Sequence, residues 1–456
     1  MANTNQRTDG VEASGKPAKS PTQSWRFILR ALKYRNYRLF FTGQTVSLIG
    51  TWMTRVATSW LVYRLTGSAF LLGIVGFAGQ IPTFFLGPFA GVWVDRWDRH
   101  RTLVVTQILS TLQSFALAGL ALGGVINVTH IIWLSIAQGL INTFDMPARQ
   151  AFVVQMVENR EDLGNAIALN SSMVNAARLL GPSIAGVIIA VSGEGYCFLI
   201  DGISYLAVIA SLLAMTNLVR PPAKQRKAIV HELKEGWRYA FRSVPIRSIL
   251  LLLGTVSLIG MPYTVLLPIF AKNVLHGGPH TLGFLMGASG IGALVGAMTL
   301  AARKSVRGLG RVVPIAAGIF GAGLIALGVS HVLWLSLVLM LIVGGAMMEQ
   351  MAASNTILQT IVEEDKRGRV MSLYSMAFLG MAPFGSLLAG TMAAKIGAPR
   401  TVIFTGAVCI VAAAGFALNL PAIRDAIRPI YRELGIIPEI ASGVQSASAL
   451  TTPPED

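Results

Sequence analysis

Long apolar stretches separated by short polar ones make up most of this chain, and that pattern restricts its possible folds. Twelve stretches can cross a bilayer, because a membrane-spanning helix needs about 20 mostly apolar residues. Backbone polar groups inside lipid must be satisfied within the segment, which favours helices. The sequence therefore predicts an all-α polytopic membrane protein. The expected spans are 38–64, 69–94, 102–124, 129–153, 165–191, 196–218, 246–272, 279–302, 312–330, 332–358, 370–394 and 400–420.

The spans fall into two sets of six, separated by a polar and basic segment. A weak repeat supports this division, because Gln155 and Gly186 recur 204 residues later as Gln359 and Gly390. We therefore expect five regions. These are a cytoplasmic N-terminal tail with an interfacial helix (1–36, with the basic amphipathic run at 24–39), a six-helix bundle (37–218), a cytoplasmic linker (219–245), a second six-helix bundle (246–420) and a cytoplasmic C-terminal tail (421–456).

The net charge of +16 indicates either nucleic-acid binding or a membrane topology signal. Of the 37 Lys and Arg residues, 29 fall in the tails, the linker and alternate loops, whereas four fall in the opposite loops. This bias is the positive-inside pattern, which predicts that both termini are cytoplasmic and that no nucleic acid is bound. The two cysteines lie in apolar segments, so we expect neither a disulfide framework nor a metal site.

The loop between spans two and three carries the most specific motif, Gly91-Val-Trp-Val-Asp95-Arg96-Trp-Asp98-Arg99-His-Arg101. Gly91 would allow a neighbouring helix to approach closely, and the arginines would hold the loop at an anionic membrane surface. On these residues alone, the loop could be a simple anchor. It resembles the signature loop of the major facilitator superfamily, although Asp98 stands where that family commonly has Gly. The resemblance implies that Gly91, Asp95, Arg96, Arg99 and Arg101 form a gating element.

The fifth span contains Gly181-Pro182-Ser-Ile-Ala-Gly186, which resembles an element that accompanies antiport in exporters of the same superfamily. Ordinary helix packing by small residues is the alternative. The segments 138–151 and 367–380 also resemble a bacterial subgroup that includes the enterobactin exporter and related secretion transporters. Ser135 stands where many proton antiporters of the superfamily carry Arg.

Ionisable residues within spans are expensive and usually face a cavity or a partner. Asp145 and Arg149 are spaced i, i+4, which predicts an ion pair on one helix face. Arg55 and Arg178 could attract an anionic substrate group or neutralise a carboxylate. Asp201 lies near the end of span six and is expected to face water. The candidates for substrate or proton coupling are Arg55, Asp145, Arg149, Arg178, Glu349 and Gln350.

Glu349 has no cation nearby in the sequence, so it is a candidate proton carrier or a structural glutamate bonded between helices. Gln350 could line a cavity or join two helices. Soluble-enzyme signatures such as a Walker A loop or a paired-cysteine zinc pattern are missing, so we expect no enzyme activity and no cofactor.

The sequence and its resemblance together imply a secondary transporter of the bacterial inner membrane that works as a monomer by alternating access. The expected cargo is a small hydrophobic or siderophore-like molecule or a drug, exported by proton antiport. Two alternatives are a solute importer or facilitator of the same fold, and a membrane scaffold or sensor that transports nothing.

Overall fold

A computed structural model describes residues 29–216, 229–303 and 305–433. Residues 1–28 and 434–456 of the expected tails, and residues 219–228 of the expected linker, lie outside the described residues. Every regular element in the described chain is helical. The long helices are α2 (Arg35–Thr66), α3 (Ala69–Ala78), α4 (Ile81–Arg96), α5 (Arg99–Leu122), α6 (Val128–Met156), α7 (Arg160–Ser192), α8 (Glu194–Leu213), α9 (Ile229–Arg242), α10 (Val244–Thr255), α11 (Tyr263–Ile269), α12 (Pro279–Ala301), α13 (Leu309–Val329), α14 (Leu333–Ile361), α15 (Glu364–Ser375), α16 (Ala382–Ile396), α17 (Ala398–Leu418) and α18 (Leu420–Glu433).

Ten helical segments of the described chain are long and apolar enough to cross a membrane. Helices α2 and α6 are not among them, although they are 32 and 29 residues long. Both carry charged residues within their length, namely Arg55 in α2 and the Asp145–Arg149 pair in α6. With these two helices included, the architecture is consistent with the twelve predicted spans.

Three of the predicted spans are interrupted helices. The second breaks at Gly79–Gln80 between α3 and α4. The seventh contains two π-helical turns, Val256–Gly260 (η2) and Phe270–Val274 (η3), on either side of α11. The eleventh contains a further π-helical turn, Met376–Gly380 (η4), between α15 and α16. Such π-helical turns inside α-helices are frequently found at functional sites.

The internal repeat extends to the helix boundaries. Helix α7 spans Arg160–Ser192, and the α15–η4–α16 rod spans Glu364–Ile396, with both ends displaced by the same 204 residues. The connecting turns match as well, since Gly193 and Gly397 have φ values of 88° and 86°. Glycine is favoured at both turns, because other residues rarely adopt a positive φ. The two halves of the chain are therefore built on the same plan over this stretch.

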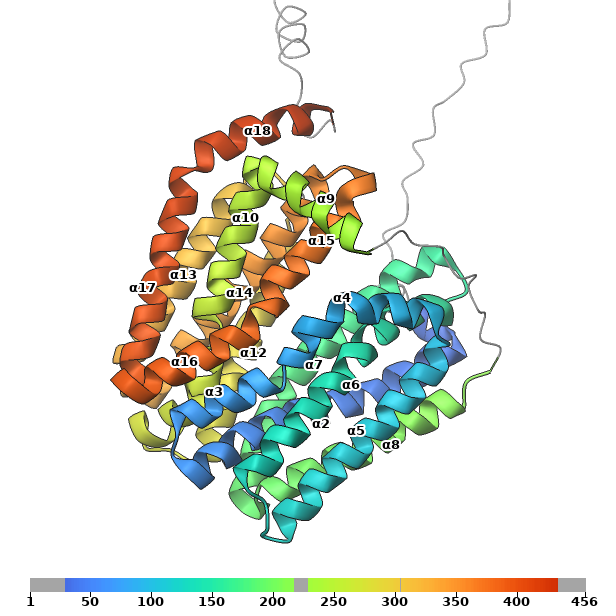
Figure 1. Cartoon of the computed structure of the whole chain (residues 1–456), viewed down its shortest axis with the longest axis vertical. Coiled ribbons are helices and arrows are strands. Elements are labelled where there is room, and N and C mark those ends of the chain that lie inside the picture. The colour runs from blue at the N-terminus through green and yellow to red at the C-terminus, as the bar shows by residue number, and fades with distance from the viewer. Residues whose placement is uncertain (1–28, 217–228, 304, 434–456) are drawn as a thin grey trace, which may run out of the picture.

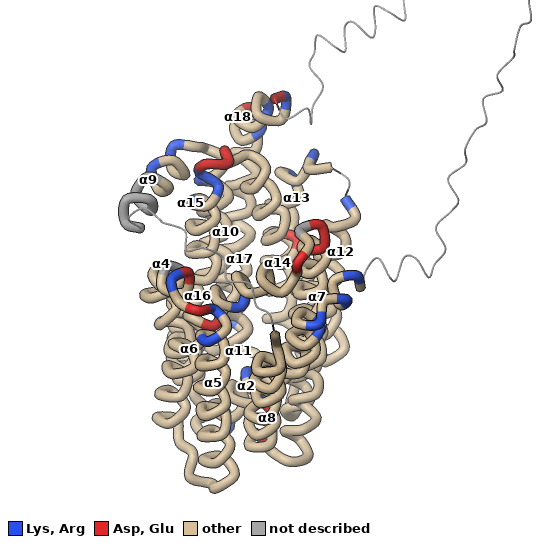
Figure 2. The backbone as a smooth tube through the Cα atoms, turned by 90° about the vertical axis from the view of Figure 1, so that its right-hand side faces the viewer, with Lys and Arg blue, Asp and Glu red and all other residues tan. Residues whose placement is uncertain are grey.

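Helices α2–α8 form an N-terminal half and helices α10–α17 form a C-terminal half, which diverge toward the end that carries α9, α15 and the α4–α5 turn (Figure 1). We call this the basic end, since it holds the turns bearing Arg96, Arg99 and Arg101 together with α9, α18 and the start of α15. At the opposite end the connections are short, such as Gly67–Ser68 and Gly397. Figure 2 shows that charged residues gather mainly near helix ends, leaving the helices themselves largely uncharged.

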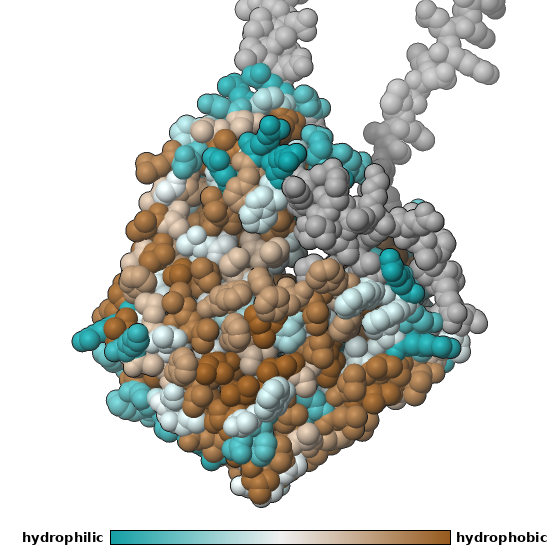
Figure 3. Space-filling view, viewed as in Figure 1, coloured by the Kyte–Doolittle hydropathy of each residue, from teal (hydrophilic) through white to brown (hydrophobic). Residues whose placement is uncertain are grey.

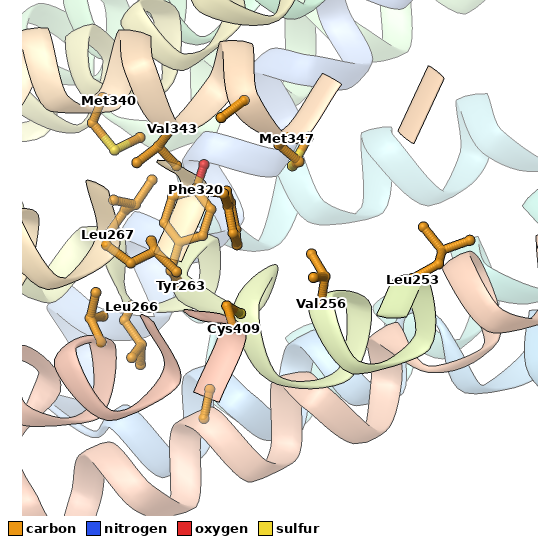
Figure 4. Packing of buried hydrophobic residues seen from close by; sticks show 14 of the residues in the cluster. Leu253, Val256, Tyr263, Leu266, Leu267, Phe320, Met340, Val343, Met347 and Cys409 are labelled. Carbon is orange, nitrogen blue, oxygen red and sulfur yellow. The ribbon is translucent and has the colours of Figure 1, made fainter. Parts of the chain in front are cut away.

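Apolar side chains fill the centre of each half and also cover much of the outer surface. In the C-terminal half, Tyr263 packs edge-on against Phe320, with ring centres 6.1 Å apart, beside Val343 and Met347 (Figure 4). The surface over the helix bodies is largely hydrophobic, whereas hydrophilic side chains concentrate toward the ends (Figure 3). An apolar exterior around an apolar core is what a lipid environment requires.

The predicted interfacial helix over 24–39 is wrong within the described residues. Arg30–Lys33 form a short 3-10 turn (η1), and α2 already begins at Arg35. Asp162 at the start of α7 fixes this turn, with carboxylate oxygens 2.9 Å from Arg30 Nε and 2.7 Å from Lys33 Nζ. The hydrogen bond to Asp162 is the main cause of a raised pKa at Lys33. The helix-like run that the sequence predicts from His231 to Arg242 is confirmed, because it lies in α9, which packs against α15.

Candidate functional site

The two halves meet along two helix pairs, α7 with α12 and α3 with α16. Small residues make these crossings possible. A Cβ atom added at Gly73 would lie 2.7 Å from the Ser386 carbonyl oxygen and 3.0 Å from the Gly390 Cα. One added at Gly186 would lie 2.9 Å from the Cα of His280. The halves are therefore in backbone contact from the opposite end toward the middle of the molecule.

Toward the basic end the contacts between the halves become sparse. Phe84 packs against Phe384 with ring centres 4.9 Å apart, and α4 meets the η4 turn beyond it. Gly91, farther along α4, has no atom within 4 Å of where its Cβ would stand. The expectation that Gly91 receives a close helix is therefore wrong for this conformation, because the two halves have separated at that level.

A cluster of two arginines around one indole lies in the middle of α2 and α7. The Arg55 Cζ lies 4.8 Å from the Trp52 ring centre, and the Arg178 Cζ lies 5.8 Å from it. The side chain of Arg55 is exposed, and Arg178 is half-buried. Among the described residues, neither arginine forms an ion pair. We call Arg55, Trp52 and Arg178 the Arg–Trp–Arg cluster.

This cluster adjoins the C-terminal half. The Arg178 carbonyl oxygen would lie 3.1 Å from a Cβ at Gly290 of α12, so α12 passes directly beside it. Trp52 in turn packs against α7 at Gly181. Two guanidinium groups that contact one indole ring without an acidic partner leave several N–H donors available. Such a surface suits an anionic or planar group.

Asp145 and Arg149 form the ion pair that their spacing predicts. Asp145 is only 3% exposed. It also accepts hydrogen bonds from Thr106 Oγ1 and Gln107 Nε2 of α5, both at 2.8 Å. This carboxylate therefore joins α5 to α6 as well as to Arg149.

Glu349 and Gln350 occupy different environments although they are neighbours on α14. Glu349 is half-buried, and its Oε1 accepts a hydrogen bond of 2.7 Å from Thr299 of α12. Gln350 is buried, and neither of its side-chain polar atoms has a partner among the described residues. The structure thus places Glu349 between α12 and α14 of the C-terminal half.

The predicted gating loop is a tight turn between α4 and α5. Asp95 Oδ1 accepts from Arg99 Nη2 at 3.2 Å, and Arg96 and Arg101 are exposed. Asp98 is the N-cap of α5, where its Oδ1 accepts from the Arg101 backbone N–H at 3.1 Å. An aspartate is well suited to capping a helix, which gives Asp98 a local function in place of the glycine common in the superfamily loop.

The antiport-like element divides its contacts between two helices. Gly181 faces α2 at Ile49 and Trp52, whereas Gly186 faces α12 at Gly283. Pro182 lies inside α7 without ending it. The two glycines thus allow α7 to pack closely against both α2 of its own half and α12 of the C-terminal half.

Asp201 corrects one expectation. It was predicted to face water, but it is 1% exposed inside the N-terminal half. Its Oδ2 accepts hydrogen bonds from Thr54 of α2 at 2.8 Å and Ser114 of α5 at 3.0 Å. Hydropathy alone could not find this, because rotation of α8 decides whether a residue near its end faces outward or inward.

Two cavities lie away from the Arg–Trp–Arg cluster. One of about 560 Å³ lies at the opposite end beside Trp60, Arg64 and His280, where Arg64 pairs with Glu194 at 2.7 Å. The other, of about 390 Å³, lies under α18 at the basic end beside Arg311 and Tyr431. None of the predicted coupling residues lines either cavity.

Comparison with known proteins identifies the family. A model of the family described as "Transmembrane secretion effector" matches residues 28–438. The staphyloferrin A transporter of Staphylococcus aureus is 26% identical, covering 82% of this chain and 94% of its own. Macrolide efflux protein A of Streptococcus pyogenes is 25% identical, covering 83% and 95%. The multidrug efflux pump Tap of Mycobacterium tuberculosis is 27% identical, covering 85% and 94%.

Solved structures share the fold at low sequence identity. The POT family transporter PepTSo has a TM-score of 0.68 at 12% identity, covering 86% of this chain and 98% of its own. A bacterial homologue of the human lysosomal transporter Spinster has a TM-score of 0.64 at 14% identity, covering 90% and 99%. The chain therefore belongs to the transmembrane secretion effector family of the major facilitator superfamily, and it is a multi-pass membrane transport protein rather than an enzyme.

Proposed function

We propose that this protein exports a small organic anion of the siderophore type across the bacterial cell membrane by alternating access, driven by proton antiport. The two halves, 37–218 and 246–420, are the moving bodies, and the basic end faces the cytoplasm. The charge bias of the loops supports that orientation. The relatives named for siderophore or drug transport support export of a small molecule.

The single observation that carries the substrate class is the Arg–Trp–Arg cluster. It lies halfway along the helices, beside α12 of the other half, and presents two cations with no acidic partner among the described residues. An isolated charge at this depth is expensive. A bound anion would offset that cost, whereas a cationic drug would add to it.

The sparse contacts toward the basic end support a conformation open to the cytoplasm. Helix α4 already contacts η4 where the two halves begin to separate. Closure at that end would therefore bring Gly91 of α4, which has no close neighbour in this conformation, against η4 and α15. Separation of α7 from α12 and of α3 from α16 would then open the opposite end. The Asp95–Arg99 turn lies where this motion is largest, which fits a gating role for the loop.

Transport into proteoliposomes tests the proposal. Staphyloferrin A and the macrolide erythromycin serve as probes, each with and without a pH gradient. We expect accumulation of staphyloferrin A that depends on the gradient, and little accumulation of the macrolide. Transport of the macrolide alone would replace the organic anion with a drug as cargo. Transport of neither, in a protein that binds a partner protein, would favour the scaffold alternative.

A drug-efflux function is the second candidate, and the relatives named for macrolide and multidrug efflux favour it. It predicts that neutralising Arg55 leaves macrolide transport intact, because a cationic or neutral drug gains nothing from a guanidinium group. The same probes therefore distinguish the two candidates.

A further inference from the structure

One face of α5 is polar although that face is buried inside the N-terminal half. Thr106, Gln107, Ser110 and Ser114 are 5%, 2%, 2% and 1% exposed. Thr106, Ser110 and Ser114 recur every four residues, and Gln107 lies next to Thr106 and three residues before Ser110, so they lie along one side of the helix. We call these four residues the α5 seam. Helix α5 packs against α6 and α8, so the seam lies within the half rather than against lipid.

The seam ends at a buried carboxyl group in each direction. Toward the basic end, Thr106 and Gln107 donate to Asp145 of α6. Toward the opposite end, Ser114 donates to Asp201 of α8. The seam spans eight residues of helix, which corresponds to about 12 Å along its axis at 1.5 Å per residue. A side chain from α6 joins it midway, because Gln138 Nε2 donates to Ser110 Oγ at 3.3 Å.

The two carboxyl groups differ in their charge environment. Asp145 has Arg149 as an ion-pair partner. Asp201 has no ion-pair partner among the described residues. A carboxylate buried without a cation is expensive, and binding a proton removes that cost.

The ionisable groups on the helices that pack against Asp201 leave it without a cationic partner, unlike Asp145. Helix α8 itself supplies Glu194, which pairs with Arg64, as well as Cys197 and Tyr205, whose hydroxyl bonds to Thr51 at 3.1 Å. Helix α5 carries no charged residue from Thr102 to Leu122. Helices α2 and α7 supply Arg55 and Arg178, but both guanidinium groups lie against Trp52.

Several polar atoms along the seam have no partner among the described residues although they are buried. They are Gln107 Oε1 and Gln138 Oε1 along the seam, and Asp201 Oδ1 and Arg149 Nε at its two ends. Buried polar atoms are normally satisfied, and ordered water supplies the partner where protein does not. A cluster of such atoms along one path is therefore expected to hold water between the two carboxyl groups.

We propose that this path is a proton relay through the N-terminal half, in which Asp201 loads a proton and the α5 seam passes it to Asp145. Each hydroxyl or water accepts one proton and releases another, so only O–H bonds form and break. The arriving proton neutralises Asp145 and so weakens the ion pair between Asp145 and Arg149. Loss of that ion pair would change the packing of α6 toward the basic end, which links protonation to the conformation of the half. The relay rests on the proton antiport proposed above and assigns it a route that avoids the Arg–Trp–Arg cluster.

Asp201→Asn tests the relay, because it keeps the shape and removes the ability to carry a proton. In proteoliposomes with staphyloferrin A as probe, we expect accumulation driven by the pH gradient to fall at least tenfold while exchange without a gradient continues. Infrared titration of the purified protein, without any substrate, should show the loss of one protonated-carboxyl band. A band unchanged by the substitution, or accumulation that stays normal, would overturn the relay.

A second pair of variants decides the question if Asp201→Asn does not fold. Ser114→Ala interrupts the seam and keeps both carboxyl groups, whereas Ser336→Ala removes a buried hydroxyl of the C-terminal half that bonds to Ser330. We expect gradient-driven accumulation to slow several-fold in Ser114→Ala and not in Ser336→Ala. Equal rates in the two variants would overturn the relay. If the unaltered protein accumulates nothing in response to a gradient, the proposed antiport itself falls.

Discussion

At the residue scale, the sequence identified which charged side chains are unusual but not how they associate. Arg55 and Arg178 were predicted from their positions inside apolar spans, yet their shared contact with Trp52 depends on how α2 and α7 rotate. Asp145 and Arg149 were predicted as a pair because a fixed helical spacing determines their geometry. Asp201 was misplaced because nothing in its local sequence distinguishes an inward from an outward face.

Replacing the two arginines separately should test the Arg–Trp–Arg cluster. Arg55→Gln and Arg178→Gln should each weaken staphyloferrin A binding about tenfold or more, since a hydrogen bond to a charged group contributes about 1.5–3 kcal/mol. Isothermal titration calorimetry in detergent measures this. Arg400→Gln, which removes an exposed arginine at the start of α17, is the matched control and should bind normally. Equal affinities in all three variants would remove the cluster from the binding site.

At the element scale, hydropathy predicted an all-helical membrane protein whose twelve expected spans are consistent with the structure, because a bilayer fixes how long an apolar helix must be. It could not predict the break at Gly79–Gln80 or the π-helical turns, which arise from local backbone adjustments within continuous apolar sequence. The α4–α5 turn, for which the sequence predicts a gating role, agrees with the expectations only in part. Its arginines lie at the basic end of the molecule. Gly91, by contrast, lacks the closely packed helix that the sequence predicts beside it.

The α3–α16 crossing should control closure of the opposite end. Gly73→Val would press against Ser386 and Gly390, and such overpacking costs about 1–3 kcal/mol. We therefore expect a several-fold faster reaction of a thiol at Ser386→Cys with a membrane-impermeant maleimide. Gly119→Val serves as the control, because a Cβ at Gly119 would meet no atom within 4 Å. Equal labelling in both backgrounds would show that this crossing does not close the path.

The α4–α5 turn offers a second test at this scale. Asp95→Asn removes the carboxylate that pairs with Arg99, which should slow transport of staphyloferrin A while leaving the amount of protein in the membrane nearly unchanged. Asp98→Asn retains an oxygen that can cap α5, so it should transport almost normally. Normal flux in Asp95→Asn would exclude a gating role for the motif.

At the scale of the whole molecule, the two halves touch along α7–α12 and α3–α16 and diverge toward the basic end (Figure 1). The sequence repeat anticipated related halves, and the shared helix boundaries extend that relation to the structure. Composition could not predict which end is closed, because the free-energy difference between two such conformations is small and arises from many weak contacts.

Paired distance measurements test alternating access most directly. Spin labels at Glu158 and Glu364 report on the basic end, and labels at Leu65 and Lys395 report on the opposite end, since all four side chains are exposed. Cys197 and Cys409 are buried and should not compete for the label. Upon a change of pH or addition of staphyloferrin A, the account predicts that one distance shortens as the other lengthens. Distances that stay fixed, or change together, while transport proceeds would contradict it.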